Sequence, residues 1–392
     1  MMALLAFYAC GVGGSSEQPT FVERDSAGVR IVESHRPAWS ASDSWTVSPT
    51  PALQIGVVDG DPHYQFFRIA GVRRLSSGEI VVADGGSHTV RWYDGAGRFI
   101  QSVGGPGEGP EEYQWLRSMI VLSGDSVLAE DGFRDRMSLY SASGSLIRSW
   151  VTQPMSAFVA PAPIGRVRDG HFIAVTERDV SPPPGYVRRE ALFVRYRDGV
   201  VEDTIVRIAG SESYLERCGP QNSGLCNIGV PFGVQIHAAV SRDRIIVGNG
   251  DEYEISVFDP TGSLQAVYRR PIPREKLPDA WVTQYIDSIV GIQPPQRQPE
   301  IRRRLEAAPR REYLPAFTDL MLDQLGCLWV AREIGPGETT RPWDVFDPSG
   351  RLLGAVILPA GMQVTQIDRE YVVGVRRDAN GVEYLVLHQL TR

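Results

Sequence analysis

Short apolar segments recur along the chain, and each ends in polar or turn-forming residues. Six of them share one pattern, in which β-branched and other apolar residues stand next to one another. They are EIVVAD (79–84), SVLAED (126–131), HFIAVT (171–176), RIIVGN (244–249), CLWVAR (327–332) and YVVGVR (371–376). Short apolar runs bounded by turn residues are typical of buried strands. The hydrophobic pattern therefore predicts a repeated β-structure.

A second motif follows five of these six segments, and it consists of an aromatic residue, a tight turn and another apolar strand. Its copies are YDGAGRFI from Tyr93, YSASGSLI from Tyr140, YRDGVVED from Tyr196, FDPTGSLQ from Phe258 and FDPSGRLL from Phe346. Asp, Pro and Gly favour hairpin turns, because Gly adopts positive φ and the Asp side chain accepts hydrogen bonds from nearby backbone N–H groups. With one further strand ahead of each first motif, every repeat is predicted to be a four-stranded antiparallel meander.

Six such repeats predict an all-β fold, a six-bladed β-propeller. The sixth repeat has no fourth strand before Arg392, and residues 52–56 (ALQIG) are expected to supply it. Closing the ring in this way removes the free edges of the first and last sheets. Residues 21–32 are expected to form an additional hairpin outside the ring. We therefore predict one propeller domain over residues 21–392.

Residues 71–113, GVRRLSSGEIVVADGGSHTVRWYDGAGRFIQSVGGPGEGPEEY, resemble the NHL-type repeat and the six-bladed propeller lipoproteins that carry it. The resemblance returns in FDPTGSL and LGCLWVA and covers roughly residues 50–390. NHL-type propellers are mostly binding platforms, and a minority are enzymes. The resemblance therefore implies the fold and favours a non-catalytic binding role, while enzymatic activity stays an open question.

The long connections are all predicted to emerge on one face of the propeller. Residues 104–113, 207–231 and 271–314 join one repeat to the next, whereas residues 177–189 and 333–342 join the second strand of a repeat to the third. In an up-and-down blade these two kinds of connection lie on the same side. We call this side the elaborated face and the opposite side the trimmed face. Function carried on loops is expected on the elaborated face, over the central channel.

The longest connection, 271–314, is predicted to be helical and lies between the fourth and fifth blades. Apolar residues at Val282, Tyr285, Ile286 and Ile289 recur at helical spacing, and Ile301 and Leu305 repeat this after a proline-rich break. The segment is also locally basic, through Arg297, Arg302, Arg303, Arg304, Arg310 and Arg311. This charge has three interpretations: a solvated helix face, attraction of an anionic ligand, or contact with a membrane surface.

Composition narrows the functional classes. The 40 Gly and 28 Pro favour turns and short strands over long helices. A net charge of −7 argues against a dedicated nucleic-acid-binding protein. No apolar run approaches the roughly 18 residues that would span a bilayer.

The N-terminal segment MMALLAFYAC, followed by GVGGSSEQPT, resembles a bacterial lipoprotein signal and tether over residues 1–20. The resemblance implies lipidation of Cys10 and a place in the bacterial cell envelope, on the periplasmic or outer-membrane side. The protein would be secreted if Cys10 is not acylated. The alternative is an unstructured tail in which the cysteine has no role.

The other cysteines suggest one disulfide. Cys218 and Cys226 bracket a polar Gly- and Pro-containing segment, and in an exported protein such a pair is expected to close a surface loop. Zinc is the alternative, but two cysteines without a nearby histidine supply only two ligands. Cys327 lies in an apolar run and is expected to be a buried free thiol.

Candidate ligand-binding residues follow the second strands, where equivalent positions would form a ring around the channel mouth. They are His88, Arg134, Arg178, Asp251 and Arg332, together with His237 in a predicted innermost strand. Carboxylates there could hold calcium, and arginines could hold a carboxylate or phosphate. For Asp84 and Asp131 a turn-forming role is favoured. No nucleophile elbow, Walker loop or paired-histidine zinc motif occurs, so no catalytic residue is assigned.

We therefore expect an exported, lipid-anchored, monomeric propeller that binds a protein or an anionic or glycan ligand through its elaborated face. No nucleic-acid partner is expected, and membrane contact is expected through the lipid anchor only. No cofactor is assigned, with calcium as the alternative. The rival hypothesis is a calcium- or zinc-dependent hydrolase or lyase with its site at the central channel. A third is an accessory subunit of an envelope complex whose helical insertion docks a partner.

Overall fold

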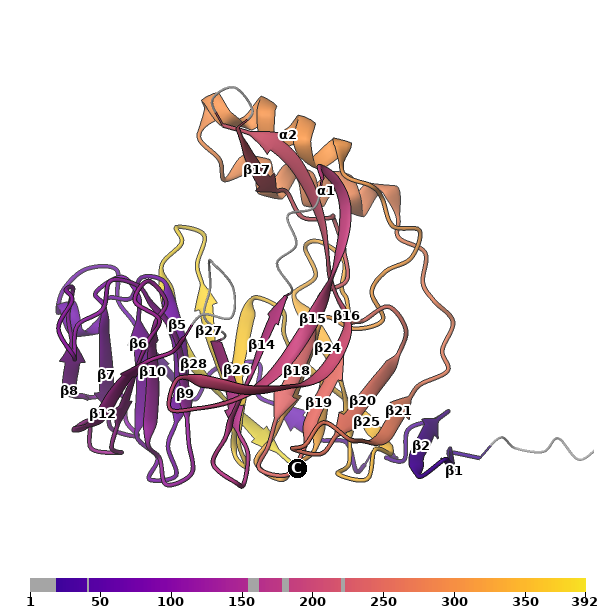
Figure 1. Ribbon diagram of the computed structural model, residues 1–392, viewed down its shortest axis with the longest axis horizontal. Coiled ribbons are helices and arrows are strands. Elements are labelled where there is room, and N and C mark those ends of the chain that lie inside the picture. The colour runs from indigo at the N-terminus through magenta and orange to yellow at the C-terminus, as the bar shows by residue number, and fades with distance from the viewer. Residues whose placement is uncertain (1–18, 41, 154–161, 178–182, 220–222) are drawn as a thin grey trace, which may run out of the picture.

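The computed structural model describes residues 19–40, 42–153, 162–177, 183–219 and 223–392. Within these residues the protein is mostly β, and its strands form six sheets. Two helices stand above the sheets at one end of the molecule (Figure 1). Cys10 and Arg178 lie outside the described residues.

The first three sheets follow one another in the chain. The first comprises β5 (Ile69–Arg74), β6 (Ile80–Asp84), β7 (Thr89–Tyr93) and β8 (Phe99–Gly104). The second comprises β9 (Leu116–Val121), β10 (Val127–Asp131), β11 (Arg136–Tyr140) and β12 (Leu146–Val151). The third comprises β13 (Ala162–Arg166), β14 (Phe172–Glu177), β15 (Gly185–Arg197), β16 (Val200–Cys218) and β17 (Gly224–Asn227).

The last three sheets incorporate strands from the N-terminal part of the chain. The fourth comprises β18 (His237–Val240), β19 (Ile245–Gly248), β20 (Glu254–Phe258) and β21 (Leu264–Arg269), extended by β2 (Val29–Ser34) and β1 (Phe21–Ser26). The fifth comprises β22 (Asp319–Leu322), β23 (Leu328–Ala331), β24 (Thr340–Phe346) and β25 (Leu352–Pro359). The sixth comprises β26 (Met362–Ile367), β27 (Tyr371–Arg377) and β28 (Glu383–Thr391), which pairs with β3 (Thr46–Val47) and β4 (Leu53–Ile55).

The first strand of each sheet neighbours the first strand of the next. Contacts link β5 to β9, β9 to β13, β13 to β18, β18 to β22, β22 to β26, and β26 back to β5. The N-terminal strand β4 pairs antiparallel with β28, at the place where the sequence predicted a missing fourth strand. The hairpin β1–β2 lies outside, where β2 pairs in parallel with β21. Four-stranded antiparallel sheets arranged in this way are those expected of a β-propeller.

The second strands are buried along their whole length in several sheets, which explains their continuous apolar pattern. Every residue of β6 and of β23 is buried. Between the first two sheets, Trp92 packs edge to face with Tyr140, with ring centroids 6.3 Å apart. The core therefore consists of layers of side chains between neighbouring sheets rather than one central cluster.

The tight turns have the chemistry that their sequences predict. Asp94, Asp259 and Asp347 each accept hydrogen bonds from backbone N–H groups of their own turn. The glycine three positions after each of them has positive φ, for example +82° at Gly97. A residue with a Cβ would strain the backbone there.

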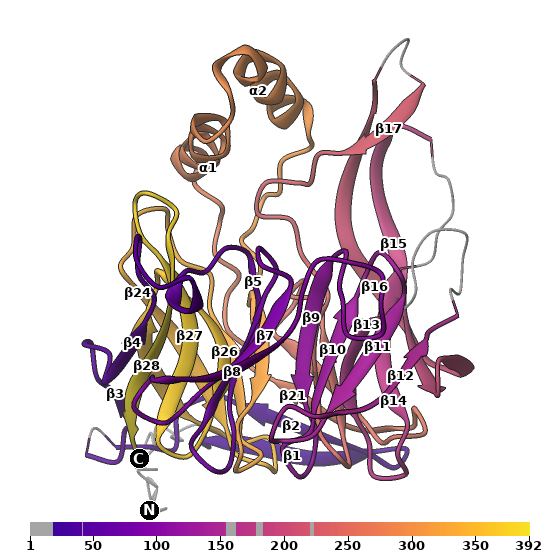
Figure 2. The same cartoon turned by 90° about the vertical axis from the view of Figure 1, so that its left-hand side faces the viewer.

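The third sheet departs from the four-stranded expectation. Residues 207–218 were predicted to lie in a connection, but they form the distal half of β16, which pairs with the start of β15. The two strands stay paired along this hairpin, and both extend well beyond their own sheet (Figure 2). At its tip β17 pairs with β16, and Cys218 and Cys226 form a disulfide with an S–S distance of 2.04 Å.

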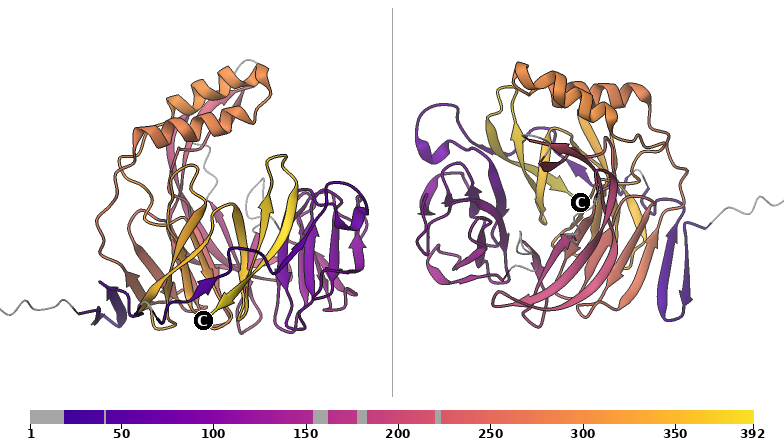
Figure 3. Two further views of the ribbon diagram at one scale, coloured as in Figure 1. Left: turned by 180° about the vertical axis from the view of Figure 1, so that it is seen from behind. Right: turned by 45° about the horizontal axis from the view of Figure 1, so that its top comes forward.

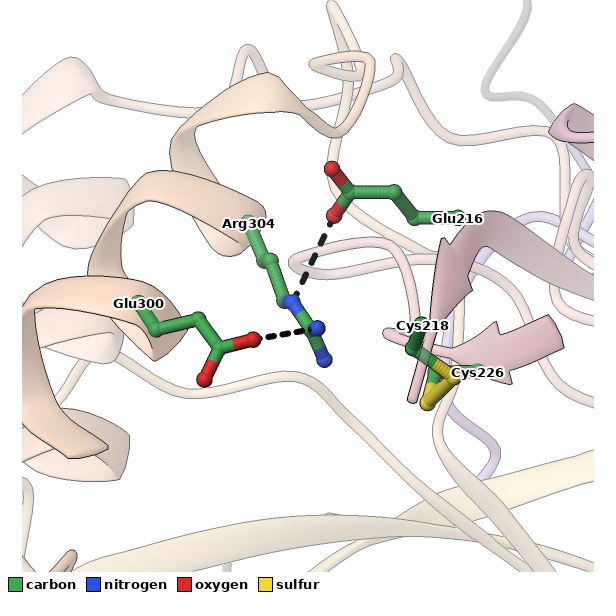
Figure 4. The surroundings of a disulfide bond; sticks show 5 residues. All are labelled: Glu216, Cys218, Cys226, Glu300 and Arg304. Carbon is green, nitrogen blue, oxygen red and sulfur yellow. Dashed lines mark hydrogen bonds and ion pairs between the residues drawn. A yellow bond between two sulfur atoms is a disulfide. The ribbon is translucent and has the colours of Figure 1, made fainter. Parts of the chain in front are cut away.

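The insertion consists of α1 (Asp279–Gly291) and α2 (Gln298–Ala307), and short 3-10 helices occur at Pro62–Tyr64 and Pro295–Arg297. Val282, Ile286 and Val290 of α1 are buried together with Leu305 of α2, as the helical spacing predicted. Arg304 of α2 forms ion pairs with Glu300 and with Glu216 of β16, close to the disulfide (Figure 4). The helices and the tip of the β15–β16 hairpin therefore stand together on the elaborated face (Figure 3).

Candidate functional site

A cleft of about 600 Å³ lies on the elaborated face beside α1. Its walls are α1, the segment that leads into β18, the segment 315–318 that leads into β22, the connection between β23 and β24, and the turn at residues 360–361. Its lining includes Phe232, His237, Tyr285, Thr318, Glu333 and Arg341. Five parts of the chain therefore build one concave surface.

Aromatic contacts hold α1 over the cleft. The Phe232 ring lies between Trp281 and Tyr285, with centroid distances of 6.1 and 5.5 Å. The Trp281 indole packs on Gly335 so closely that a Cβ at this glycine would lie 2.6 Å from Cζ2 of the indole. Gly335 therefore allows the β23–β24 connection to approach the helix.

His237 is the first residue of β18 and contributes to the floor of the cleft. It packs against the buried Phe317 ring, with centroids 6.0 Å apart. Burial lowers the pKa of His237 to about 4, because the charged imidazolium is poorly solvated there. The imidazole is therefore neutral at pH 7.

Two carboxyl groups at the ends of neighbouring strands also have shifted pKa values. Burial raises the pKa of Asp319, the first residue of β22, to about 6. Burial also raises the pKa of Glu333, which follows β23. The Arg341 guanidinium opposes both shifts. Asp319 lines an adjoining pocket of about 340 Å³ that shares Arg341 with the cleft.

Several polar groups of the cleft lack partners. Thr318 Oγ1 and Arg341 Nε are buried without a hydrogen-bond partner. Among the residues that the structure describes, Glu333, Glu338 and Arg341 form no ion pair. Buried polar groups in proteins are nearly always hydrogen-bonded. Thr318 and the charged side chains of Glu333, Glu338 and Arg341 line one cleft and therefore keep hydrogen-bonding capacity for a ligand.

A second cleft, of about 630 Å³, lies between the fourth and fifth sheets, and most of the charged groups around it are paired. The buried Asp344 accepts hydrogen bonds from Tyr253 (2.7 Å), Arg270 (2.5 Å) and Arg332 (3.0 Å). Asp251 pairs with Arg311, with 3.1 Å between Oδ1 and Nη2, and also with Arg188. Two of the predicted ligand-binding residues, Asp251 and Arg332, thus already have partners within the protein.

The candidates on the first two sheets lie apart from this region. His88 occupies a turn with φ +60°, and its Nδ1 is buried without a partner. Arg134 forms an ion pair with Glu108. Asp84 and Asp131 accept hydrogen bonds from the backbone N–H groups of Gly86 and Phe133 in their own turns, in keeping with the favoured turn-forming role. Of the five predicted residues that the structure describes, only His237 lines the cleft beside α1.

The arginines of the insertion are largely neutralised. Arg302 pairs with Asp287 at 2.6 Å, Arg303 with Glu216 at 2.8 Å and Arg310 with Asp279 at 3.3 Å. The local excess of basic residues in the sequence therefore does not translate into unpaired charge on these helices.

Sequence reasoning missed Thr318, Asp319, Glu333 and Arg341. All four stand at strand ends or beside them, as Asp251 and Arg332 do. Asp319, Glu333 and Arg341 form no ion pair within the described residues, and Thr318 Oγ1 has no hydrogen-bond partner there, which depends on the tertiary structure. The predicted connection 333–342 does contain Glu333 and Arg341, so the expectation of function on this face was the available signal.

The described part of the chain contains no group of three or more His, Cys, Asp or Glu side chains that could hold a metal ion. None of its helices has the length and apolar character needed to cross a membrane. Cys327 is a buried free thiol, and burial raises its pKa to about 11.

Comparison with known proteins shows similarity in structure only. No family model and no curated protein matches the chain, so the NHL-type assignment stays a prediction. A protein of Bacteroides fragilis that is provisionally described as exported has 12% identity and a TM-score of 0.51, over 92% of this chain and 99% of its own. A member of the DUF4221 family from Bacteroides vulgatus has 11% identity and a TM-score of 0.51, over 89% of this chain and 99% of its own. Virginiamycin B lyase from Staphylococcus aureus has 8% identity and a TM-score of 0.41, over 89% of this chain and 100% of its own. At these identities the similarity to the two Bacteroides proteins extends to the fold alone.

Proposed function

We propose that this protein is an exported, monomeric six-bladed β-propeller that binds a neutral, hydroxyl-rich ligand, such as a glycan segment, in the cleft beside α1. The observation that carries the proposal is the pair of buried donors without partners, Thr318 Oγ1 and Arg341 Nε. Residues 21–392 form one domain in this proposal, and the pairing of β4 with β28 closes its ring.

The cleft offers the two kinds of contact that a sugar ring requires. Phe232 and Tyr285 present aromatic surface on one wall. Arg341 and Thr318 supply donors in the same cleft, while the Glu333 carboxylate supplies acceptors. Binding sites commonly combine an apolar or aromatic wall with a few polar groups that orient the ligand.

The charge of the cleft favours a neutral ligand over an anionic one. Glu333 and Glu338 line it together with one arginine, Arg341, and Asp319 lies in the adjoining pocket. An anionic ligand would meet the like charges of these carboxylates. Of the two ligand classes expected from the sequence, the cleft therefore favours the glycan.

The location follows from the sequence. The N-terminal segment resembles a lipoprotein signal, and the disulfide between Cys218 and Cys226 fits an oxidising compartment. We propose lipidation of Cys10 and a place in the cell envelope. The elaborated face would then present its cleft to soluble or surface-bound glycans.

The proposal is tested by calorimetric titration of the full chain with a panel of neutral and acidic oligosaccharides. At least one neutral saccharide should bind. Arg341→Gln and Thr318→Val should each weaken its binding by about tenfold, the effect of losing one good hydrogen bond to a buried group.

Arg98→Gln serves as the matched control, because Arg98 is an exposed residue that pairs with Asp94 in a turn on the trimmed face. The Arg98→Gln variant should bind the neutral saccharide with the affinity of the wild-type protein. The proposal fails if no neutral saccharide binds, or if the two cleft variants bind as tightly as the control.

A further inference from the structure

A third pocket, of about 760 Å³, lies on the trimmed face, opposite the cleft beside α1. We call it the axial pocket, because every innermost strand contributes to it. The contributing residues are Arg73, Ile120, Ile164, Val240, Leu322 and Gln366. The tight turns that follow these strands, such as those at Ser76, Asp125 and Gly170, form its rim.

The axial pocket is basic, although the protein as a whole is acidic. Its charged lining consists of Arg73, Arg74, Arg166, Arg168 and Arg242 against Asp125 and Asp323. A net positive lining in a protein with a net charge of −7 indicates a local concentration of positive charge.

Some of these charges belong to ion pairs. Arg74 Nη1 lies 3.1 Å from Asp368 Oδ2, and Arg168 Nε lies 2.7 Å from Asp243 Oδ1. Asp323 pairs with Arg392 at 2.8 Å. These ion pairs contribute to the fold, and they leave little net charge on Arg74, Arg168 and Asp323.

The other three arginines of the axial pocket lack such partners. In the part of the chain that the structure describes, Arg73, Arg166 and Arg242 form no ion pair. Arg73 Nη1 donates to the carbonyl oxygen of Val72 at 2.8 Å, and Arg166 Nε donates to that of Gly170 at 3.0 Å. Each guanidinium therefore keeps further N–H groups for another acceptor.

The three arginines come from different sheets and line one pocket. Arg73 belongs to the first sheet, Arg166 to the third, and Arg242 follows the first strand of the fourth. Ile120, Ile164 and Leu322 line the same pocket. Burial lowers the pKa of Arg73 to about 10, so its charge is poorly solvated. A bound anion would compensate this cost, and it would do so more strongly than at an open surface.

We propose that the axial pocket binds a phosphate group, which Arg73, Arg166 and Arg242 hold from three sides. Guanidinium groups match phosphate oxygens in a two-pronged geometry, which makes arginine well suited to this role. The phosphate group could belong to a soluble phosphate ester or to a phospholipid headgroup. The site is separate from the glycan cleft, and neither proposal depends on the other.

The test is calorimetric titration of inorganic phosphate and pyrophosphate into the full chain, produced without acylation, at low ionic strength. Chloride at the same ionic strength is the reference, because salt screens nonspecific attraction. Arg73→Gln and Arg166→Gln should each weaken pyrophosphate binding by about tenfold, since each removes one charge-assisted contact. Arg98→Gln should bind as the wild-type protein does.

Arg166 is exposed at the rim, so its variant keeps the test valid if Arg73→Gln fails to fold. Far-ultraviolet circular dichroism identifies such a failure. A second arm measures flotation with vesicles of phosphatidylglycerol and phosphatidylcholine against vesicles of phosphatidylcholine alone.

Arginine-dependent binding of pyrophosphate without flotation would identify a soluble phosphate ester, and arginine-dependent flotation would identify a lipid headgroup. The proposal is overturned if neither probe binds, or if both Arg→Gln variants bind as the wild-type protein does. Because the glycan titration uses Arg341 and Thr318 on the other face, either proposal can fail without the other.

Discussion

Replacing Gly335 by Ala tests whether α1 packs over the cleft as the structure shows. The new Cβ would lie 2.6 Å from Cζ2 and 3.0 Å from Cε2 of Trp281. Carbon atoms in contact prefer a separation of about 3.5–4.0 Å, so the helix or the β23–β24 connection must move by roughly 1 Å. Overpacking of this kind typically costs about 1–3 kcal/mol.

Gly361→Ala is the matched control for this change. Gly361 lines the same cleft, but a Cβ there would meet no atom within 4 Å. The free energy of unfolding should change by less than about 0.5 kcal/mol, as is usual for an open surface position. The two variants thus differ in steric contact and not in chemistry.

Urea unfolding followed by tryptophan fluorescence gives the stability of each variant. Hydrogen exchange of the peptide that covers α1 locates the effect. Gly335→Ala should lose about 1–3 kcal/mol and exchange faster in α1, whereas Gly361→Ala should match the wild-type protein in both. Equal stability and equal α1 exchange in the two variants would refute the packing of Trp281 on Gly335.

Three further predictions concern titratable groups. Asp344→Asn should destabilise the protein by about 3 kcal/mol in urea unfolding, because Arg270 and Arg332 would lose their buried counter-charge; an effect below that of Asp94→Asn, at a half-buried turn position, would contradict this. The pKa of His237 is lowered to about 4, so its NMR signals should not titrate between pH 5 and 8, and a midpoint near 6.5 would show that it is solvated. The pKa of Asp319 is raised from 3.8 to about 6, so its contribution to stability is present below pH 4 and lost as the pH rises through 6. Asp319→Asn should therefore gain stability relative to wild type across this range, and a pH-independent difference would contradict the shift.

Much of the fold is predictable from local pattern. The second strands are recognisable because they are buried on both faces, as in β6, and their apolar runs need no knowledge of the partner sheet. The turns at Asp94 and Asp259 are recognisable because Asp and Gly act on their own backbone. The extension of β16 was missed because residues 209–213, AGSES, are small or polar and resemble a loop.

The site is far less predictable, because it depends on which polar groups remain unpaired. The pairing of Arg332 with Asp344 follows from the register in which Val330 faces Asp344. The importance of Thr318 and Arg341 arises only once α1 and the β23–β24 connection enclose them. Neither relation can be obtained from spacing along the chain.

Hydrogen exchange with and without the tightest-binding neutral saccharide tests the central claim most directly, because it locates the ligand without a substitution. We expect the bound saccharide to slow hydrogen exchange in α1, in residues 333–341 and in the segment that leads into β18. Protection confined to the loops of the first two sheets, around His88 and Arg134, would contradict it.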